Sequence, residues 1–332
     1  MKILIIRLSS LGDIVLTEPI CALLHDSYPQ AEIHYVCKQA FADLPVLFAT
    51  EVKVIPYDKS LQFHWKLRET KYDIVIDLHG KLASILLMLI SRAGKKLSYN
   101  KQRSIRKAIV KGNTNLNIDS TVQLYMSSLK KLGIGTSWQY PKLMIPPNVS
   151  LDIFQDILPN TIAIFPSATH FTKRYPADMW IDFINRNNGY NYALFGSNYD
   201  APLCNAIATE SSNPCANYAG IMGYEDLLIA LKRCVLVISG DTGPMHLAAA
   251  INMPQIAIFG GTHPRLGFRP LNAKAKILSM DLSCQPCSLH GEKACPLGHF
   301  NCMRLLEADK IANAIQDFQL SKASATNSGD KP

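Results

Sequence analysis

The sequence predicts an α/β protein made of two doubly wound, parallel-sheet domains that face a central cleft. In each half of the 332-residue chain, short apolar runs of strand length alternate with amphipathic stretches of helix length, which is the pattern of parallel sheets with crossover helices. A proline-rich segment separates the halves. Each half also has a polar turn between a strand-like and a helix-like run, and ligands of parallel sheets bind at such turns.

Residues 1–150 are predicted to form the N-terminal domain. Four apolar runs of strand length alternate there with four helical stretches, and Pro19 is expected to kink the first helix or to delay its start. The predicted strands are 3–6, 32–36, 52–55 and 74–78, and the predicted helices are 13–27, 63–69, 81–93 and 121–132.

The linker is predicted at residues 141–159, which hold four prolines. The alternation restarts in residues 160–306, the predicted C-terminal domain. Its predicted strands are 162–165, 192–195, 236–238, 256–259 and 276–280, and its predicted helices are 177–187, 201–210, 224–233 and 244–251. A last helix is expected at 307–320, and the small polar residues of the tail 321–332 predict disorder.

Composition limits the function classes. The chain is 48% hydrophobic and 18% charged, which is ordinary for a globular protein. Its net charge of +8 fits an anionic partner such as a nucleotide, a phospholipid surface or a nucleic acid. No nucleic-acid-binding motif accompanies the charge, so nucleic acid is not expected. Met1 leads directly into a strand-like run, and the most apolar stretch, 85–90, is far shorter than a membrane span. We expect a cytoplasmic protein.

The turn from Ser239 to His246, Ser-Gly-Asp-Thr-Gly-Pro-Met-His, is the most informative motif. It follows an apolar run and opens a helix-like segment, whose free N–H groups and positive dipole end favour an anion such as a phosphate. Asp241 either accepts hydrogen bonds from a sugar hydroxyl or caps the helix. His246 either contacts the phosphate or is an ordinary core histidine.

Two further turns have similar chemistry. The loop 165–176 places Thr169 and Lys173 after a strand, and a lysine before a helix start is suited to bind a phosphate. Asp200 follows another strand and is a candidate for binding a ribose hydroxyl. Near the N-terminus, the turn that holds Ser10, Gly12 and Asp13 also leads from strand to helix. The loop 165–176 alone is equally well explained as an ordinary polar loop, but beside the Gly-Asp-Thr-Gly turn it favours a diphosphate site.

These motifs resemble the bacterial lipopolysaccharide heptosyltransferases, glycosyltransferase family 9. The resemblance rests on residues 5–14, on Thr-Lys-Arg-Tyr-Pro at 172–176, on the Gly-Asp-Thr-Gly-Pro-Met-His block and on Phe-Gly-Gly-Thr-His-Pro at 259–264, and it extends over residues 1–318. It implies the GT-B fold of two Rossmann-like domains. It also implies an ADP-heptose donor bound by the C-terminal half and a lipopolysaccharide-core acceptor bound by the N-terminal half.

The resemblance also assigns roles by motif position. Asp13 becomes the general base that takes the proton of the acceptor hydroxyl, with inversion at the anomeric carbon. Thr169 and Lys173 hold the diphosphate, so no catalytic metal is expected. The other residues expected at the donor are Ser10, Gly12, Asp200, Asp241, Thr242, Gly243 and His246. A helix N-terminus should lower the pKa of Asp13, which keeps it ionised but weakens it as a base.

Basic residues of the N-terminal half are candidates for binding the acceptor. The run 95–111 has apolar residues at helical spacing, which predicts an amphipathic basic helix, and a smaller basic patch surrounds Trp65. An anionic sugar-lipid at the inner membrane surface would suit both. The candidate residues are Lys66, Arg68, Arg103, Arg106 and Lys107.

Four cysteines, Cys284, Cys287, Cys295 and Cys302, have the spacing C-x2-C-x7-C-x6-C. This spacing suggests a structural zinc site, with iron as the second choice, which would fold a loop near the cleft. His290 and His299 are substitute ligands, and unligated thiols are the alternative.

Two other functions stay open. Family members that modify autotransporter proteins carry a cysteine-ligated iron, so the resemblance also allows a protein acceptor. A non-catalytic nucleotide-sugar-binding protein is the third possibility.

Overall fold

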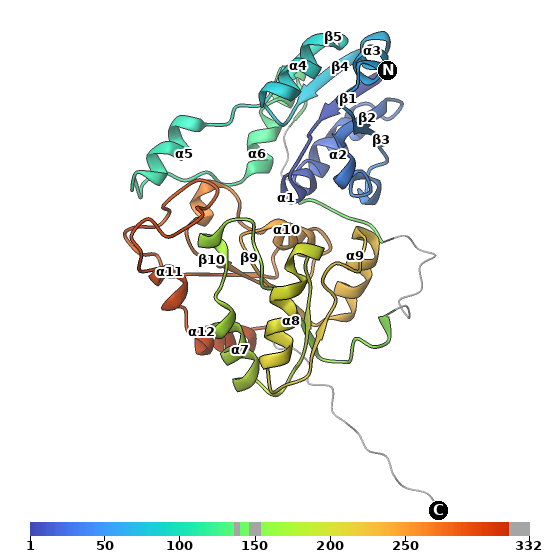
Figure 1. Cartoon of the computed structure of the whole chain (residues 1–332). Coiled ribbons are helices and arrows are strands. Elements are labelled where there is room, and N and C mark those ends of the chain that lie inside the picture. Colours follow the sequence, from blue (N-terminus) through green and yellow to red (C-terminus); the bar gives the residue numbers. More distant parts are fainter. Residues whose placement is uncertain (136–139, 146–153, 319–332) are drawn as a thin grey trace, which may run out of the picture.

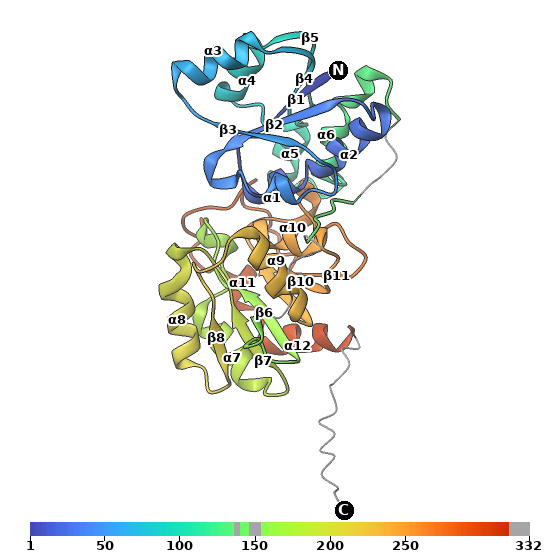
Figure 2. The ribbon, with the colours of Figure 1, turned by 90° about the vertical axis from the view of Figure 1, so that its right-hand side faces the viewer.

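The structure, a computed structural model, describes residues 1–135, 140–145 and 154–318 and contains two parallel sheets, one in each half of the chain (Figures 1 and 2). The N-terminal sheet has the order β3-β2-β1-β4-β5. Its strands are β1 (Lys2–Ile6), β2 (Glu32–Lys38), β3 (Lys53–Tyr57), β4 (Lys71–Asp77) and β5 (Arg92–Ser98). The helices of this half are α1 (Leu11–Val15), α2 (Glu18–Ser27), α3 (Leu61–Glu69), α4 (Leu82–Ile90), α5 (Arg103–Val110) and α6 (Thr121–Met126).

The C-terminal sheet has the order β11-β10-β9-β6-β7-β8. Its strands are β6 (Thr161–Phe165), β7 (Asn191–Leu194), β8 (Cys215–Asn217), β9 (Leu236–Gly240), β10 (Gln255–Phe259) and β11 (Ala275–Ser279). The helices are α7 (Ala177–Arg186), α8 (Ala201–Glu210), α9 (Tyr224–Arg233), α10 (Gly243–Ala250), α11 (Asn301–Arg304) and α12 (Ala308–Gln316).

Both sheets reverse their strand order at one point, which confirms the predicted doubly wound architecture. In the N-terminal sheet, β1 lies between β2 and β4. Its Ile5 pairs with Tyr35 of β2 on one side and with Ile76 of β4 on the other. The order reverses between β1 and β4, and in the second sheet it reverses between β6 and β9. Such reversal points are where ligands bind in doubly wound sheets.

The structure corrects several predicted elements. The predicted helix 13–27 is two helices, α1 and α2, and the predicted helix 121–132 is α-helical only as far as Met126. Two edge strands were not predicted. β5 has the sequence RAGKKLS with one buried side chain, and β8 has three residues, so neither shows an apolar run. Part of the predicted linker (146–153) and the tail from 319 onward lie outside the described residues. Within the described part, no helix has the length and apolar character that a membrane crossing requires.

The two halves pack directly at the N-termini of α1 and α10. A Cβ on Gly12 would lie 2.5 Å from His246 Cδ2, and a Cβ on Gly243 would lie 2.6 Å from Leu11 Cδ2. Any larger residue would force the helices apart, so these glycines permit the close approach.

Residues 142–144 bind to both halves where the chain crosses between them. The Lys142 N–H donates to Glu18 Oε2 at 2.8 Å, and the Leu143 N–H donates to the Ala250 carbonyl at 3.1 Å. Glu18 is almost completely buried. Burial raises its pKa to about 7, and the hydrogen bond from Lys142 offsets only part of this effect.

We expect Glu18→Gln to stabilise the protein at pH 8. Since folding raises the pKa of Glu18 from 4.5 to about 7, the stability due to its neutral form is present below pH 4.5 and is lost as the pH rises to 7. The neutral amide of the variant would avoid this loss, so its free energy of unfolding should exceed that of the wild type by about 3 kcal/mol at pH 8 and by less than about 1 kcal/mol at pH 5. Urea unfolding at both pH values measures this, with the exposed Glu69→Gln as control. An equal gap at the two pH values would contradict the prediction.

Candidate functional site

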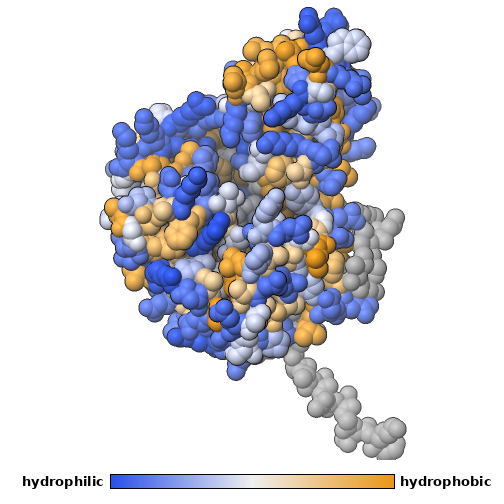
Figure 3. Space-filling model, in the orientation of Figure 1, coloured by the Kyte–Doolittle hydropathy of each residue, from blue (hydrophilic) through white to orange (hydrophobic). Residues whose placement is uncertain are grey.

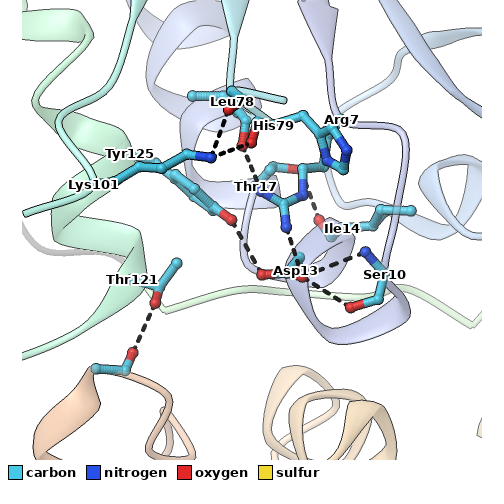
Figure 4. A network of polar contacts seen from close by, with 12 residues as sticks. Arg7, Ser10, Asp13, Ile14, Thr17, Leu78, His79, Lys101, Thr121 and Tyr125 are labelled. Atoms are coloured by element: carbon cyan, nitrogen blue, oxygen red, sulfur yellow. Dashed lines mark hydrogen bonds and ion pairs between the residues drawn. The ribbon is translucent and has the colours of Figure 1, made fainter. Parts of the chain in front are cut away.

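Asp13 lies at the end of β1, on the first turn of α1, and its carboxylate has three side-chain partners (Figure 4). Asp13 Oδ2 is 2.6 Å from Arg7 Nη2 and accepts a 2.8 Å hydrogen bond from the Ser10 hydroxyl. Asp13 Oδ1 is 3.5 Å from the Tyr125 hydroxyl. The predicted donor residue Ser10 is therefore directed at the carboxylate.

The surroundings of Asp13 keep it ionised. Burial alone would raise the pKa of Asp13, but the charge of Arg7 and the hydrogen bonds from Ser10 outweigh it and lower the pKa from 3.8 to about 2. Arg7 is itself buried, donates to the Leu78 carbonyl at 2.5 Å and lies 5.7 Å from the centre of the Tyr125 ring. At neutral pH the pair is a carboxylate beside a guanidinium.

Further polar groups lie beside Arg7 in the loops after β4 and β5. The Lys101 ammonium donates to the carbonyls of His79 and Gly80, both at 2.8 Å. Burial, with the nearby Arg7, lowers the pKa of His79 to about 4, and burial, with the nearby Arg103, lowers that of Lys101 to about 8. The sequence analysis did not select Arg7, His79 or Lys101 as site residues. The signal that could have found them is their place in polar loops that follow predicted strands or lead into the basic run.

In the C-terminal half, Lys173 and Asp241 form an ion pair. Lys173 Nζ is 2.8 Å from Asp241 Oδ2, and the Thr262 hydroxyl donates to the same oxygen at 2.7 Å. Asp241 is almost completely buried. It therefore holds Lys173 in place, while its contact with a sugar hydroxyl stays a prediction and the predicted helix cap is wrong. The cap position of α10 belongs to Thr242.

His246 lies on α10 at the seam between the halves, beside Gly12. It is buried, and its burial lowers its pKa to about 4, so the ring is neutral at pH 7. Its Nδ1 atom is buried without a hydrogen-bond partner in the described part of the chain. A polar ring nitrogen in this position has an unused capacity to bind a ligand.

The other predicted donor residues divide into two groups. Gly12 and Gly243 serve the contact between the halves, whereas Thr169 is exposed. Asp200 accepts hydrogen bonds from the backbone N–H and the hydroxyl of Ser197, at 2.8 and 2.7 Å. Its carboxylate thus stabilises the turn before α8.

The structure separates the predicted acceptor residues. Lys66 and Arg68 are exposed on α3, which lies at the end of the N-terminal half remote from the C-terminal half (Figures 1 and 2). Arg103 and Lys107 are exposed on α5.

Arg106, unlike the other residues predicted to bind the acceptor, is not exposed. It is buried and donates to the Leu266 carbonyl at 3.2 Å and to the Thr121 hydroxyl at 3.1 Å. Its guanidinium also lies 4.9 Å from the centre of the Phe268 ring. Arg106 therefore joins the halves and is not a free acceptor-binding cation.

The cysteine-rich loop 284–302 packs over the C-terminal half. The Cys287 N–H donates to the Gly261 carbonyl at 3.0 Å, and the Glu292 N–H donates to the Thr172 hydroxyl at 2.8 Å. Gly291 lies against the aliphatic stem of Lys173. Backbone hydrogen bonds thus fix the loop beside the lysine.

The predicted metal site is not assembled in the described residues, where no three or more His, Cys, Asp or Glu side chains are grouped so that they could hold a metal ion. Cys302 is buried in an apolar cluster on α11, and the Cys287 thiol donates to the Gly261 carbonyl. The zinc or iron site therefore stays a prediction of the cysteine spacing.

Comparison with known proteins identifies one family. The model of glycosyltransferase family 9 (heptosyltransferase) matches residues 61–298. Lipooligosaccharide heptosyltransferase 2 of Campylobacter jejuni is 25% identical over 321 residues, which cover 94% of this chain and 96% of that protein.

Two solved structures from Escherichia coli are similar to the fold. ADP-heptose lipopolysaccharide heptosyltransferase II gives a TM-score of 0.76 at 21% identity, and the match covers 96% of this chain and 98% of that chain. Heptosyltransferase WaaC with ADP gives a TM-score of 0.73 at 20% identity, and the match covers 96% of this chain and 100% of that chain. These likenesses confirm the predicted GT-B arrangement of two Rossmann-like domains.

We expect Arg106→Met to destabilise the protein by about 2–3 kcal/mol, because the Leu266 carbonyl and the Thr121 hydroxyl would lose a charged donor. Arg103→Met, on the exposed side of the same helix, should change stability by less than about 0.5 kcal/mol. Guanidinium unfolding of the two variants measures the difference. Equal stabilities would mean that Arg106 does not join the halves.

Proposed function

Since the chain belongs to glycosyltransferase family 9, the heptosyltransferases, we propose that it transfers a heptose from ADP-heptose to a lipopolysaccharide inner-core acceptor, with inversion at the anomeric carbon. The observation that carries the proposal is the ionised Asp13 carboxylate at the seam between the two halves, where His246 of α10 lies near both Asp13 and the Lys173–Asp241 pair. Relatives named as lipopolysaccharide or lipooligosaccharide heptosyltransferases support the choice of donor and acceptor.

The transfer needs one base and one stabilised leaving group. The acceptor oxygen forms a bond to the anomeric carbon while the bond from that carbon to the ADP β-phosphate oxygen breaks, and the hydroxyl proton passes to the Asp13 carboxylate. With a pKa of about 2, Asp13 is always available but only weakly basic. It accepts the proton late, when the attacking oxygen is already strongly acidic.

The leaving ADP is stabilised by the C-terminal half. Lys173 is fixed by Asp241 and by the loop that covers its stem, so its charge is positioned before the donor binds. The N-terminal N–H groups of α10 add a partial positive charge, and the unpartnered Nδ1 of His246 can bind a donor oxygen. These groups supply the charge compensation without a catalytic metal.

The acceptor is proposed to bind against the N-terminal half. Lys101, with the exposed Arg103 and Lys107, forms a cationic wall that suits the phosphates of a lipopolysaccharide core. His79 lies beside Lys101 and is neutral at pH 7. This acceptor would place the enzyme in the cytoplasm, at the inner surface of the inner membrane.

The direct test measures ADP release from ADP-heptose with and without heptose-deficient core acceptor. Release that depends on the acceptor is the expected result. ADP binding without any release would contradict the proposal and would favour a protein acceptor, another donor sugar or a binding role.

We expect Asp13→Asn to lower kcat by about 10³-fold or more, because the amide cannot take the proton. Its ADP affinity should change by less than about twofold, since Asp13 faces the acceptor side. The ADP-release assay and calorimetry with ADP measure the two effects, and the exposed Asp26→Asn on α2 is the matched control. Wild-type turnover in Asp13→Asn would disprove the base assignment.

Lys173→Ala should raise the Kd for ADP about 10- to 100-fold and also slow transfer, because one charged contact to the diphosphate is lost. The variant leaves the buried Asp241 without its cation, so Lys173→Ala combined with Asp241→Asn is a second variant that restores charge balance. Lys293→Ala in the neighbouring loop is exposed and serves as control. Unchanged ADP affinity in a folded double variant would remove Lys173 from the donor site.

A further inference from the structure

The outward side of α4 is apolar. Leu82, Ile85, Leu86 and Leu89 recur at the i, i+3, i+4, i+7 spacing of one helix face, and all four are exposed, from 85% for Leu82 to 38% for Ile85. We call these four side chains the α4 face; Figure 3 shows a hydrophobic patch over this helix. A surface helix normally turns such a stripe toward the core, so an outward stripe marks an interaction site.

The neighbouring helix α3, which packs against α4, extends the apolar surface. Its Leu61 is 88% exposed and its Trp65 is 63% exposed, one helical turn apart. A tryptophan has an apolar ring and a polar N–H group, and this combination suits the boundary between water and lipid.

The positive charge of the protein is concentrated in the segment that contains α4. Residues 78–118 hold nine lysines and arginines and no aspartate or glutamate, whereas the whole chain has a net charge of +8. The rest of the chain is therefore close to neutral. Lys81 precedes α4, Lys96 donates to the Leu89 carbonyl at its other end, and Arg92 and Lys95 are exposed on β5. Figure 1 shows α4 and α5 on the same side of the N-terminal half.

We propose that the α4 face, with Trp65 and the surrounding cations, binds the surface of an anionic lipid bilayer. Leucines enter the headgroup boundary while lysines and arginines at both helix ends contact lipid phosphates. A second copy of the chain is a poorer occupant, because a symmetric contact would bring the two basic regions together. This inference rests on the proposed function, since an enzyme must bind close to the bilayer in order to reach an acceptor that is anchored in lipid.

The α4 face begins near the edge of the sheet at which Asp13 lies. α4 starts just after the carboxyl end of β4, the edge at which Asp13 lies. The Ser84 hydroxyl donates to Asp77 Oδ2 at 3.0 Å, and Asp77 Oδ1 accepts the N–H of His79 at 2.8 Å. An acceptor whose lipid stays in the bilayer can therefore extend from Leu82 toward Asp13.

The test is co-sedimentation of the full-length protein with vesicles of phosphatidylethanolamine and phosphatidylglycerol, and with vesicles of phosphatidylcholine alone. The wild type should bind the anionic vesicles more tightly, and binding should weaken with salt. Leu86→Asp with Leu89→Asp should lose about tenfold or more in vesicle affinity. Lys95→Gln with Lys96→Gln should lose roughly fivefold for each charge removed.

The matched control is Ile221→Asp, which adds a charge at a 70% exposed site in the C-terminal half and should bind vesicles like the wild type. All variants should keep wild-type ADP affinity and wild-type ADP release with a lipid-free core oligosaccharide. The inference is overturned if the wild type does not bind the anionic vesicles, if it binds phosphatidylcholine equally well, or if the leucine variant binds like the wild type. It is also overturned if the wild type forms a dimer without lipid and the leucine variant abolishes that dimer, because the α4 face would then bind a second copy of the chain. Vesicle binding without ADP release would refute the proposed function and leave the membrane surface standing.

Discussion

The ion pair between Arg7 and Asp13 is the contact on which the rest of the site depends, and its strength comes from its surroundings. A buried guanidinium is costly unless its other N–H groups and its planar face also find partners. The Leu78 carbonyl accepts from Nη1 and the Tyr125 ring lies beside the guanidinium, so one arginine joins the ends of β1 and β4 to α6, whereas Nε has no hydrogen-bond partner among the described residues. The carboxylate is fixed where these elements meet. The close contact of Gly12 and Gly243 then sets its position relative to the donor half.

This pair also constrains the chemistry. The same positive charge that holds Asp13 ionised reduces its affinity for a proton, so a mechanism driven by strong deprotonation of the acceptor does not fit the site. In the proposed transfer the larger contribution comes from departure of the nucleotide diphosphate, whose negative charge Lys173 of the C-terminal half would stabilise. Asp241 makes Lys173 rigid but partly neutralises its charge. A diphosphate that displaces this contact would receive the full charge of the lysine only as its own negative charge grows.

The elements were largely predictable because apolar runs mark buried strands, and the helices 201–210 and 224–233 agree with the structure to the residue. The edge strand β5 was not, since its exposed lysines leave no apolar run. Asp13 and Lys173 could be found because turn chemistry is local. Arg7, His79 and Lys101 were not selected, because a place in a polar loop is only a weak signal and their contacts are with distant segments, as with Arg7 and Leu78. Arg106 shows the converse error: its basic helix was predicted, but a sequence pattern cannot say which cation meets the carbonyl of Leu266.

A rigid connection between the α4 face and Asp13 has a consequence for specificity. Asp77 is fully buried and accepts hydrogen bonds from the N–H groups of His79 and Gly80 and from the Ser84 hydroxyl, so the start of α4 and the loop beside Arg7 move together. If α4 rests on the bilayer, the height of the base above the lipid is then fixed by the fold. A hydroxyl at one distance along a lipid-anchored sugar chain reaches the carboxylate, and hydroxyls nearer to or farther from the lipid do not. Selection of the acceptor position would then depend on geometry at the membrane as well as on contacts with the sugar.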